Sequence, residues 1–400
     1  MTSVQHAPAS AVRRLSSPSD VRRMLLGHAL ASVGMSLPWP LLLVLVWDRT
    51  HSDLLLGATG AARMLPYVAF SWAAGRLADA RRRDQVVLAS VIARVIALVI
   101  VAAAIGLGQL PLAVLAAAAA VAAGTPAYPA LAAALPDVAG PRTDRATELL
   151  VTVEVASFVV GPALGGLLLW PPTRSATPAV AVALVAAAWC VLRPVRLPAP
   201  TREPGEPARP RLRASVRGGV LATIVLMSAV NFVGALVAIA LLPLAERLWA
   251  GDAATYGVAT GVLGFGALGG PLLARLGRTD GERIRWGLVL LGLTLGAVAA
   301  APAVAWAVAP LAVAGGAAVH VEASATRLLQ QAVPDRLRAS AFGLADSAMV
   351  GAALVGSLAG PVLAGLVDPR TLLAGLAAAT ILASGAAKSK RWMQVSAQIR

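Results

Sequence analysis

Five ionisable residues that lie inside long apolar stretches of the sequence have the side chains best placed to do chemistry. They are Arg63, Arg94, Glu154, His320 and Glu322. An uncompensated charge at the centre of a bilayer costs at least about 2.5 kcal/mol, so such side chains usually face a partner or an aqueous cavity. The chemistry that these residue types support is proton exchange and the binding of a charged group.

Each of these residues has a structural interpretation beside the functional one. Glu154, near the start of its stretch, suits either proton exchange or a salt bridge with an arginine at the same membrane face. Arg63 and Arg94, near mid-depth, suit the binding of an anion or the pairing of nearby carboxylates, and a structural pairing is favoured. His320 and Glu322 project about 200° apart around a helix, so we expect one to line a cavity while the other packs. Three further residues near the expected inner ends of spans should reach water by snorkelling: His28, Arg327 and Asp346.

The sequence contains no recognisable catalytic or metal-binding constellation. It has four histidines without clustered metal ligands, and its one cysteine, Cys190, lies within an apolar stretch. No serine or cysteine stands in the setting of a nucleophile, and no phosphate-binding loop for ATP is present. We therefore expect no catalytic residue, no enzyme activity, no cofactor and no metal.

The elements that must position the ionisable residues are membrane spans. Hydrophobic residues make up 58% of the 400 residues and charged residues 13%, with a mean hydropathy of +0.76, which is typical of a multi-pass membrane protein. Because about 20 apolar residues cross a bilayer as a helix, we predict an all-α membrane protein with twelve spans. They are 24–47, 54–74, 85–107, 111–134, 149–169, 177–192, 219–245, 254–274, 286–302, 306–326, 342–366 and 371–387.

The net charge of +15 does not indicate a nucleic-acid partner, because the basic residues sort by side of the membrane. With the N-terminus inside, the outer loops hold Arg49, Arg174, Arg247 and Arg370, and almost all other basic residues fall on the inner side. This asymmetry is the positive-inside rule. We predict a multi-pass protein in the lipid bilayer of a bacterial cytoplasmic (plasma) membrane, with both termini in the cytoplasm.

The chain also repeats itself. Leu135-Pro136-Asp137 and the glycine-rich run 161–166 return in the second half as Val333-Pro334-Asp335 and the run 360–365. Duplication predicts two pseudo-symmetric six-helix bundles. The expected organisation is a cytoplasmic tail (1–20), an N-terminal bundle (21–192), a proline- and arginine-rich cytoplasmic linker (193–217), a C-terminal bundle (218–387) and a second tail (388–400).

A burst of charge between the second and third spans carries a family resemblance. We expect residues 75–84 to form a tight cytoplasmic turn, in which Gly75, Asp79, Arg81 and Arg83 form a pattern of one glycine, one aspartate and two arginines. Together with the duplication, this pattern resembles the loop between helices 2 and 3 of the major facilitator superfamily of transporters. Phrases such as Leu135-Pro136-Asp137 resemble, more narrowly, the enterobactin-exporter-like branch of bacterial efflux proteins.

The resemblance implies roles for further residues. It implies that Gly75 and Asp79 dock the basic turn against the eleventh helix near Phe342 and Gly343, as a latch for one conformation. A glycine–proline run in the fifth span resembles a signature of exporters and would let one helix rock against another: Gly161, Pro162, Gly165 and Gly166. The helices that line the central cavity in this superfamily would contribute Trp39, Tyr128, Asn231 and Phe232 beside His320 and Glu322.

These expectations converge on a monomeric secondary transporter that works by alternating access. A proton-coupled exporter of a hydrophobic or amphiphilic small molecule, such as a drug, an antibiotic or a siderophore-like metabolite, is the favoured function. An importing symporter on the same fold and a transport-inactive membrane sensor or scaffold are the alternatives. The expected partners are a small-molecule substrate, protons and lipid.

Overall fold

The structure is a computed structural model that describes residues 18–169, 173–200, 218–247, 249 and 253–386. Within these ranges every regular element is a helix. The expected tails (1–20 and 388–400) and linker (193–217) lie largely outside the described residues.

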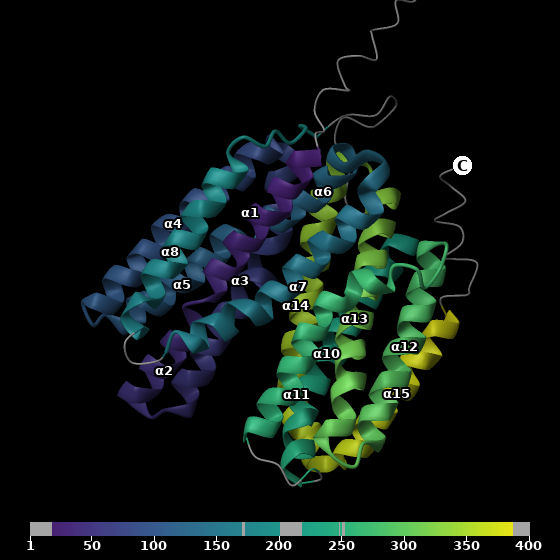
Figure 1. The fold of residues 1–400 in the computed structure, drawn as a ribbon. Coiled ribbons are helices and arrows are strands. Elements are labelled where there is room, and N and C mark those ends of the chain that lie inside the picture. The colour runs from purple at the N-terminus through teal and green to yellow at the C-terminus, as the bar shows by residue number, and fades with distance from the viewer. Residues whose placement is uncertain (1–17, 170–172, 201–217, 248, 250–252, 387–400) are drawn as a thin grey trace, which may run out of the picture.

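The described residues of the first half form eight α-helical segments (Figure 1). They are α1 (Pro18–Ser36), α2 (Trp39–Thr50), α3 (Asp53–Ala80), α4 (Arg83–Gly106), α5 (Leu110–Gly124), α6 (Ala127–Ala139), α7 (Thr143–Leu167) and α8 (Thr177–Leu192). Short 3₁₀ turns, η2 (Gly140–Arg142) and η3 (Arg174–Ala176), precede α7 and α8.

The second half contains longer uninterrupted helices. They are α10 (Gly219–Arg247), α11 (Ala253–Gly266), which continues as the 3₁₀ segment η4 (Ala267–Leu273), α12 (Asp280–Ala300), α13 (Val304–Ala332), α14 (Asp335–Leu366) and α15 (Pro369–Ala386).

Two of the expected spans are each broken into two helices by a proline. The span expected at 24–47 divides into α1 and α2 at Leu37-Pro38, and the span expected at 111–134 divides into α5 and α6 at Thr125-Pro126. A proline inside a helix removes one backbone donor and crowds the preceding turn. The breaks are short, because the Leu37 amide still donates to the Val33 carbonyl at 3.0 Å.

The expected turn over 75–84 is shorter than predicted. Helix α3 continues through Gly75 and Asp79 to Ala80, and α4 begins at Arg83, so only Arg81 and Arg82 connect the two helices. The glycine and aspartate of the pattern are therefore helical residues and not loop residues.

By length and composition, ten segments of the described chain qualify as membrane spans. One of them, Leu110–Leu167, has 58 residues and contains α5, α6 and α7. That length is about 87 Å of helix, far more than one crossing of a hydrocarbon core about 30 Å thick. Counting it as two crossings and adding α15 gives twelve, which is consistent with the all-α fold that the sequence predicts.

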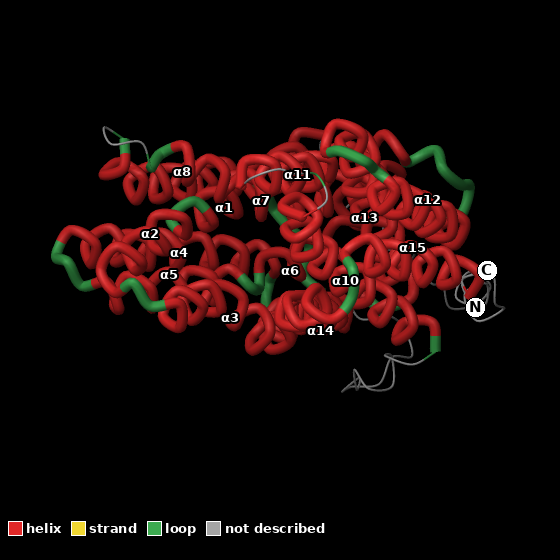
Figure 2. The backbone as a smooth tube through the Cα atoms, turned by 90° about the horizontal axis from the view of Figure 1, so that it is seen from below, coloured by secondary structure: helices red, strands yellow, loops and turns green. Residues whose placement is uncertain are grey.

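The helices form two groups that lie side by side, α1–α8 and α10–α15 (Figures 1 and 2). The two groups meet chiefly where α3 packs along α14 and where α7 packs against α13 and η4. Helix α1 begins at the end of the molecule that also carries the α3–α4 and α6–α7 connections, which we call the basic end (Figure 1). We call the opposite end the far end.

The tightest contact between the groups is a crossing of two glycines. A Cβ atom on Gly75 of α3 would collide with the Ala339 carbonyl, and one on Gly343 of α14 would collide with the Ser71 carbonyl. Only glycine allows two helix backbones to approach so closely. This crossing holds α3 against the start of α14.

Candidate transport site and ion clusters between the halves

Glu154 of α7 pairs with a histidine and not with an arginine, the partner in one of the two interpretations that the sequence left open. Its Oε2 lies 2.6 Å from Nε2 of His28 on α1, and the His28 side chain is buried. The sequence analysis placed His28 near water, but α1 begins at Pro18, so His28 lies about 15 Å along the helix. The expectation of a snorkelling residue was wrong for this reason.

Aromatic rings connect this pair to the other half of the molecule. The ring of Tyr128 lies 6.2 Å from His28 and 6.5 Å from Phe342 of α14, the latter in an edge-on arrangement. Tyr128 is buried, as is Trp39 at the start of α2. The candidate cavity residues of the first half thus lie in its packed interior.

Arg63 and Arg94 do not pair with carboxylates among the described residues. The Arg63 guanidinium lies over the Phe158 ring, 5.5 Å from its centre, a cation–π contact. Arg94 is buried and donates through Nη2 to the Gly124 carbonyl at 2.8 Å, while its Nε and Nη1 have no hydrogen-bond partner.

The position of Arg94 has a local cause. The last carbonyls of a helix lack partners within that helix, and α5 ends at Gly124, just before the Pro126 break. Arg94 and Ser90 of α4 supply donors there, since Ser90 Oγ donates to the Ala123 carbonyl at 2.6 Å. Arg94 therefore caps a broken helix and still holds donors for another group.

Glu322 of α13 is buried, and its Oε2 accepts a long hydrogen bond of 3.5 Å from Asn231 of α10. Asn231 also donates to the Met227 carbonyl at 3.0 Å within its own helix. Phe232, the neighbouring candidate, is half-buried, and its backbone packs closely on Gly356 of α14.

A third buried carboxyl, which the sequence analysis placed near water, belongs to the same region. Asp346 of α14 accepts a short hydrogen bond from Ser71 of α3, so it joins the two halves. It lies within electrostatic range of both Glu154 and Glu322. These three carboxyls, contributed by α7, α13 and α14, form what we call the central acidic group.

His320 belongs to a second assembly of charged side chains. Its Nδ1 lies 3.0 Å from Oε1 of Glu148 on α7, and Oε2 of Glu148 accepts from Arg327 at 3.3 Å. Arg327 also donates through Nε to Asp280 of α12 at 2.7 Å. We call Glu148, Asp280, His320 and Arg327 the α7–α13 ion cluster.

Arg327 is fully buried in this cluster and not exposed by snorkelling. The expectation for Arg327 was wrong because α13 continues six residues past the predicted end of the span, to Ala332, and its last turns pack against α7.

Asp79 makes the corresponding connection between α3 and α14. Its two carboxylate oxygens accept from the backbone amides of Ala339 (3.0 Å) and Ser340 (2.7 Å) in the first turns of α14. A carboxylate near a helix N-terminus is stabilised by the helix dipole. With the Gly75–Gly343 crossing, these bonds form what we call the α3–α14 latch.

Arg83, the first residue of α4, reinforces this latch. It is fully buried, and its Nη2 lies 2.7 Å from both the backbone carbonyl and Oδ1 of Asp335 at the start of α14. Arg81, the other arginine of the pattern, is exposed.

The glycine run in α7 lies against the break between α1 and α2. Cβ atoms on Gly161 and Gly165 would collide with Ser36 and with the Leu37 carbonyl, respectively. Gly166 faces open space, and Pro162 lies within the helix. The first two glycines therefore allow close packing at the joint of the first span.

Sequence reasoning missed Glu148, Asp280 and Asp335 as site residues. The repeated phrase that ends in Asp137 and Asp335 was a usable signal, because Arg83 lies near both aspartates, 3.9 Å from Asp137 and 2.7 Å from Asp335. Within the described residues no group of three or more His, Cys, Asp and Glu side chains could hold a metal ion.

These elements define a helical membrane protein whose two halves are held together by ion pairs at one end. The model of the Major Facilitator Superfamily matches residues 24–357, and the chain belongs to that family. It is therefore a transporter and not an enzyme. None of the curated proteins is similar enough in sequence to count as a match.

Solved structures agree on the fold. The chain is similar to the human organic anion transporter MFSD10 (TETRAN), with a TM-score of 0.72, 14% identity, and 93% of this chain and 100% of that chain covered. It is also similar to a bacterial homologue of the iron transporter ferroportin in an outward-facing state, with a TM-score of 0.72, 18% identity, and 94% of this chain and 99% of that chain covered. A third similar structure is the transporter FucP in the outward conformation, with a TM-score of 0.68, 12% identity, and 92% of this chain and 99% of that chain covered.

Proposed function

We propose that this protein is a proton-coupled exporter that moves a hydrophobic or amphiphilic small molecule by alternating access. The observation that carries the proposal is the combination of two ion-paired connections between the halves at the basic end with a buried acidic group beyond them. Ionisable side chains buried inside a membrane cost free energy, so a membrane protein that only has to stay folded gains little from them. A transporter can use such groups to bind and release protons or substrate as its site is exposed first to one side of the membrane and then to the other.

The connections at the basic end identify the conformation. The α7–α13 ion cluster and the α3–α14 latch both join the halves there, so the basic end is closed. If the basic end faces the cytoplasm, as the distribution of arginines indicates, the protein is closed to the cytoplasm. Two of the similar structures are of outward-facing states.

Proton coupling is assigned to the His28–Glu154 pair. The two side chains are within hydrogen-bond distance in the first half, and Glu154 is close enough to Arg94 for their charges to interact. A proton taken up by Glu154 removes one negative charge from the central acidic group. That change alters the attraction of the site for a positively charged or polar part of a substrate.

The substrate class is inferred from the aromatic side chains near the central acidic group. Tyr128 lies between His28, the partner of Glu154, and Phe342 of α14, so the site suits a molecule with both an apolar body and a polar or cationic part. We assign the protein to the bacterial plasma membrane as a monomer with cytoplasmic termini. We also propose that the protein belongs to the enterobactin-exporter-like branch of the superfamily, a prediction that rests on the sequence phrases alone.

The test is transport in membrane vesicles of known orientation. We expect uptake of an amphiphilic dye into inside-out vesicles when the lumen is acidic, and Glu154→Gln should abolish the response to the pH gradient. Thr152→Val serves as the control, because Thr152 is on the same helix and its hydroxyl donates to the Glu148 backbone carbonyl one turn earlier, at 2.7 Å. Gradient-driven flux in the opposite direction would indicate an importer, and an undiminished response in Glu154→Gln would exclude Glu154 as the coupling residue.

A susceptibility panel that compares a deletion strain with an overexpressing strain would identify the substrate. If no compound changes growth and none shifts thermal stability, the transport-inactive alternative holds.

A further inference from the structure

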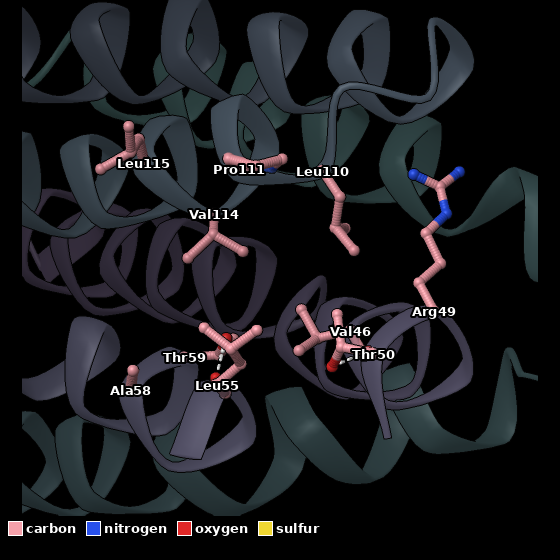
Figure 3. A pocket seen from close by; sticks show the side chains of 10 residues that line it. All are labelled: Val46, Arg49, Thr50, Leu55, Ala58, Thr59, Leu110, Pro111, Val114 and Leu115. Carbon is pink, nitrogen blue, oxygen red and sulfur yellow. Dashed lines mark hydrogen bonds between the residues drawn. The ribbon is translucent and has the colours of Figure 1, made fainter. Parts of the chain in front are cut away.

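The first half contains a cavity that plays no part in the proposed transport site. It has a volume of ≈ 480 Å³ and lies between α2, α3 and α5 near the far end. Figure 3 shows the side chains of α2 and α3 facing those of α5 across it. The lining residues are Val46, Arg49, Thr50, Leu55, Ala58, Thr59, Leu110, Pro111, Val114 and Leu115. Its volume is within the range of sites that bind small molecules.

The interior of this cavity requires an apolar occupant. Its two hydroxyl groups are already satisfied by their own helices, since Thr50 donates to the Val46 carbonyl and Thr59 to the Leu55 carbonyl, each at 2.8 Å. The other interior side chains are aliphatic. A polar ligand would find few partners there and would lose its hydration.

The cavity opens toward lipid. Leu55, Ala58 and Leu115 on its wall are exposed on the surface of the helix bundle. Trp47, two residues before Arg49 on α2, is also exposed, as is typical of aromatic side chains at the membrane–water interface. The mouth therefore lies at interfacial depth, and the apolar interior lies beside the acyl chains.

The charge at the mouth is positive. Arg49 is exposed, and its Nη1 donates to the Gly108 carbonyl at 2.7 Å, which fixes the side chain over the cavity while its Nη2 remains free to donate. The neighbouring Asp48 is paired with Arg174 at 3.1 Å, so it does not neutralise Arg49. In Figure 3 the guanidinium of Arg49 stands at one side of the aliphatic lining.

We propose that this cavity is a binding site for an anionic phospholipid, with one acyl chain between α2, α3 and α5 and the phosphate on Arg49. Arg49 lies at the depth of the membrane interface and the aliphatic lining lies deeper in the bilayer. A phospholipid has the same arrangement, with its charged headgroup at the interface and its acyl chains below. An arginine binds phosphate through paired N–H donors.

Native mass spectrometry of the delipidated protein tests the proposal with two probes that have identical chains, phosphatidylglycerol and phosphatidylcholine. The wild type should retain phosphatidylglycerol in preference to phosphatidylcholine. Arg49→Gln should weaken phosphatidylglycerol binding by about three- to tenfold, the effect of losing one basic residue beside an anionic lipid headgroup. Arg370→Gln is the matched control, because Arg370 also donates to a backbone carbonyl beyond a helix end but lies outside this cavity.

A second variant tests the cavity itself. Ala58→Trp fills the space from an exposed position, so it should leave the thermal unfolding midpoint nearly unchanged while removing the retained lipid of both kinds. Equal retention of both lipids by the wild type would overturn the proposal, and so would unchanged retention in Arg49→Gln or Ala58→Trp. None of these outcomes depends on transport activity.

Discussion

The two halves of the molecule contact each other in two different ways. At the basic end the contacts are charged and directional, as in the Glu148–Arg327 pair and the Asp79 bonds to α14. Farther along α7 the described contacts are aliphatic and small: Val151 packs with Ala267, Val319 and Ala323, and Val159 lies against Gly264. Ion pairs and close crossings specify one arrangement, whereas contacts between small apolar groups separate at low cost.

This difference indicates where stability and movement reside. Breaking a buried ion pair leaves an unpaired charge, which costs about 3–5 kcal/mol, whereas each small apolar contact contributes little more than the transfer of a methyl group, about 0.8 kcal/mol. The basic end should therefore hold one conformation until a proton or substrate changes its charges.

The largest effect is expected for Glu148→Gln. The change removes the carboxylate that faces both His320 and Arg327, and among the described residues Arg327 then keeps Asp280 as its charged partner. We expect a loss of about 3 kcal/mol of stability in the closed arrangement and a loss of transport. Thermal unfolding in detergent and vesicle flux measure the two effects. An unchanged unfolding midpoint would contradict the assigned role of the cluster.

A smaller but clear effect is expected for Gly343→Val. The added side chain would collide with the Ser71 carbonyl of α3, so the helices must separate, at a cost of about 1–3 kcal/mol. Gly351→Val on the same helix is the control, because the nearest atom to a Cβ there lies at 4.0 Å. Cysteine cross-linking between α3 and α14 should decrease in the first variant alone.

Asp79→Asn should lower transport while expression stays normal. The amide retains one acceptor oxygen but loses the charge that interacts with the start of α14, a change of about 1 kcal/mol. Flux in sealed vesicles measures it. If flux is unchanged, the latch has no role in the cycle.

The smallest effect is expected for Asp144→Asn. Asp144 pairs with Arg283 at 3.1 Å across the same end of the molecule, but its side chain is exposed, so the pair should contribute less than about 1 kcal/mol. A change in unfolding midpoint comparable with that of Glu148→Gln would remove the contrast between buried and exposed pairs.

The sequence was sufficient to predict the membrane class, the all-α fold and the superfamily, because apolar length, internal duplication and the charged pattern over 75–84 can all be recognised without knowledge of tertiary contacts. The sequence was not sufficient to predict which charged side chains pair with each other. Hydropathy places Glu154 at a depth along its helix, but the choice between an arginine and His28 depends on how α1 packs against α7. Glu148, Arg327 and Asp346 were likewise misjudged or omitted, since helix ends extend beyond the apolar core.

The two proline breaks have a consequence for how the first half can deform. Pro38 and Pro126 both lie in that half, whereas α10 and α13, the equivalent segments of the second half, each run unbroken for 29 residues. The outer portions α2 and α5 can therefore swing on their joints without disturbing a single charged contact at the basic end. Both outer portions pack on helices of their own half, so their movement would change the width of the lipid-facing cavity between α2, α3 and α5.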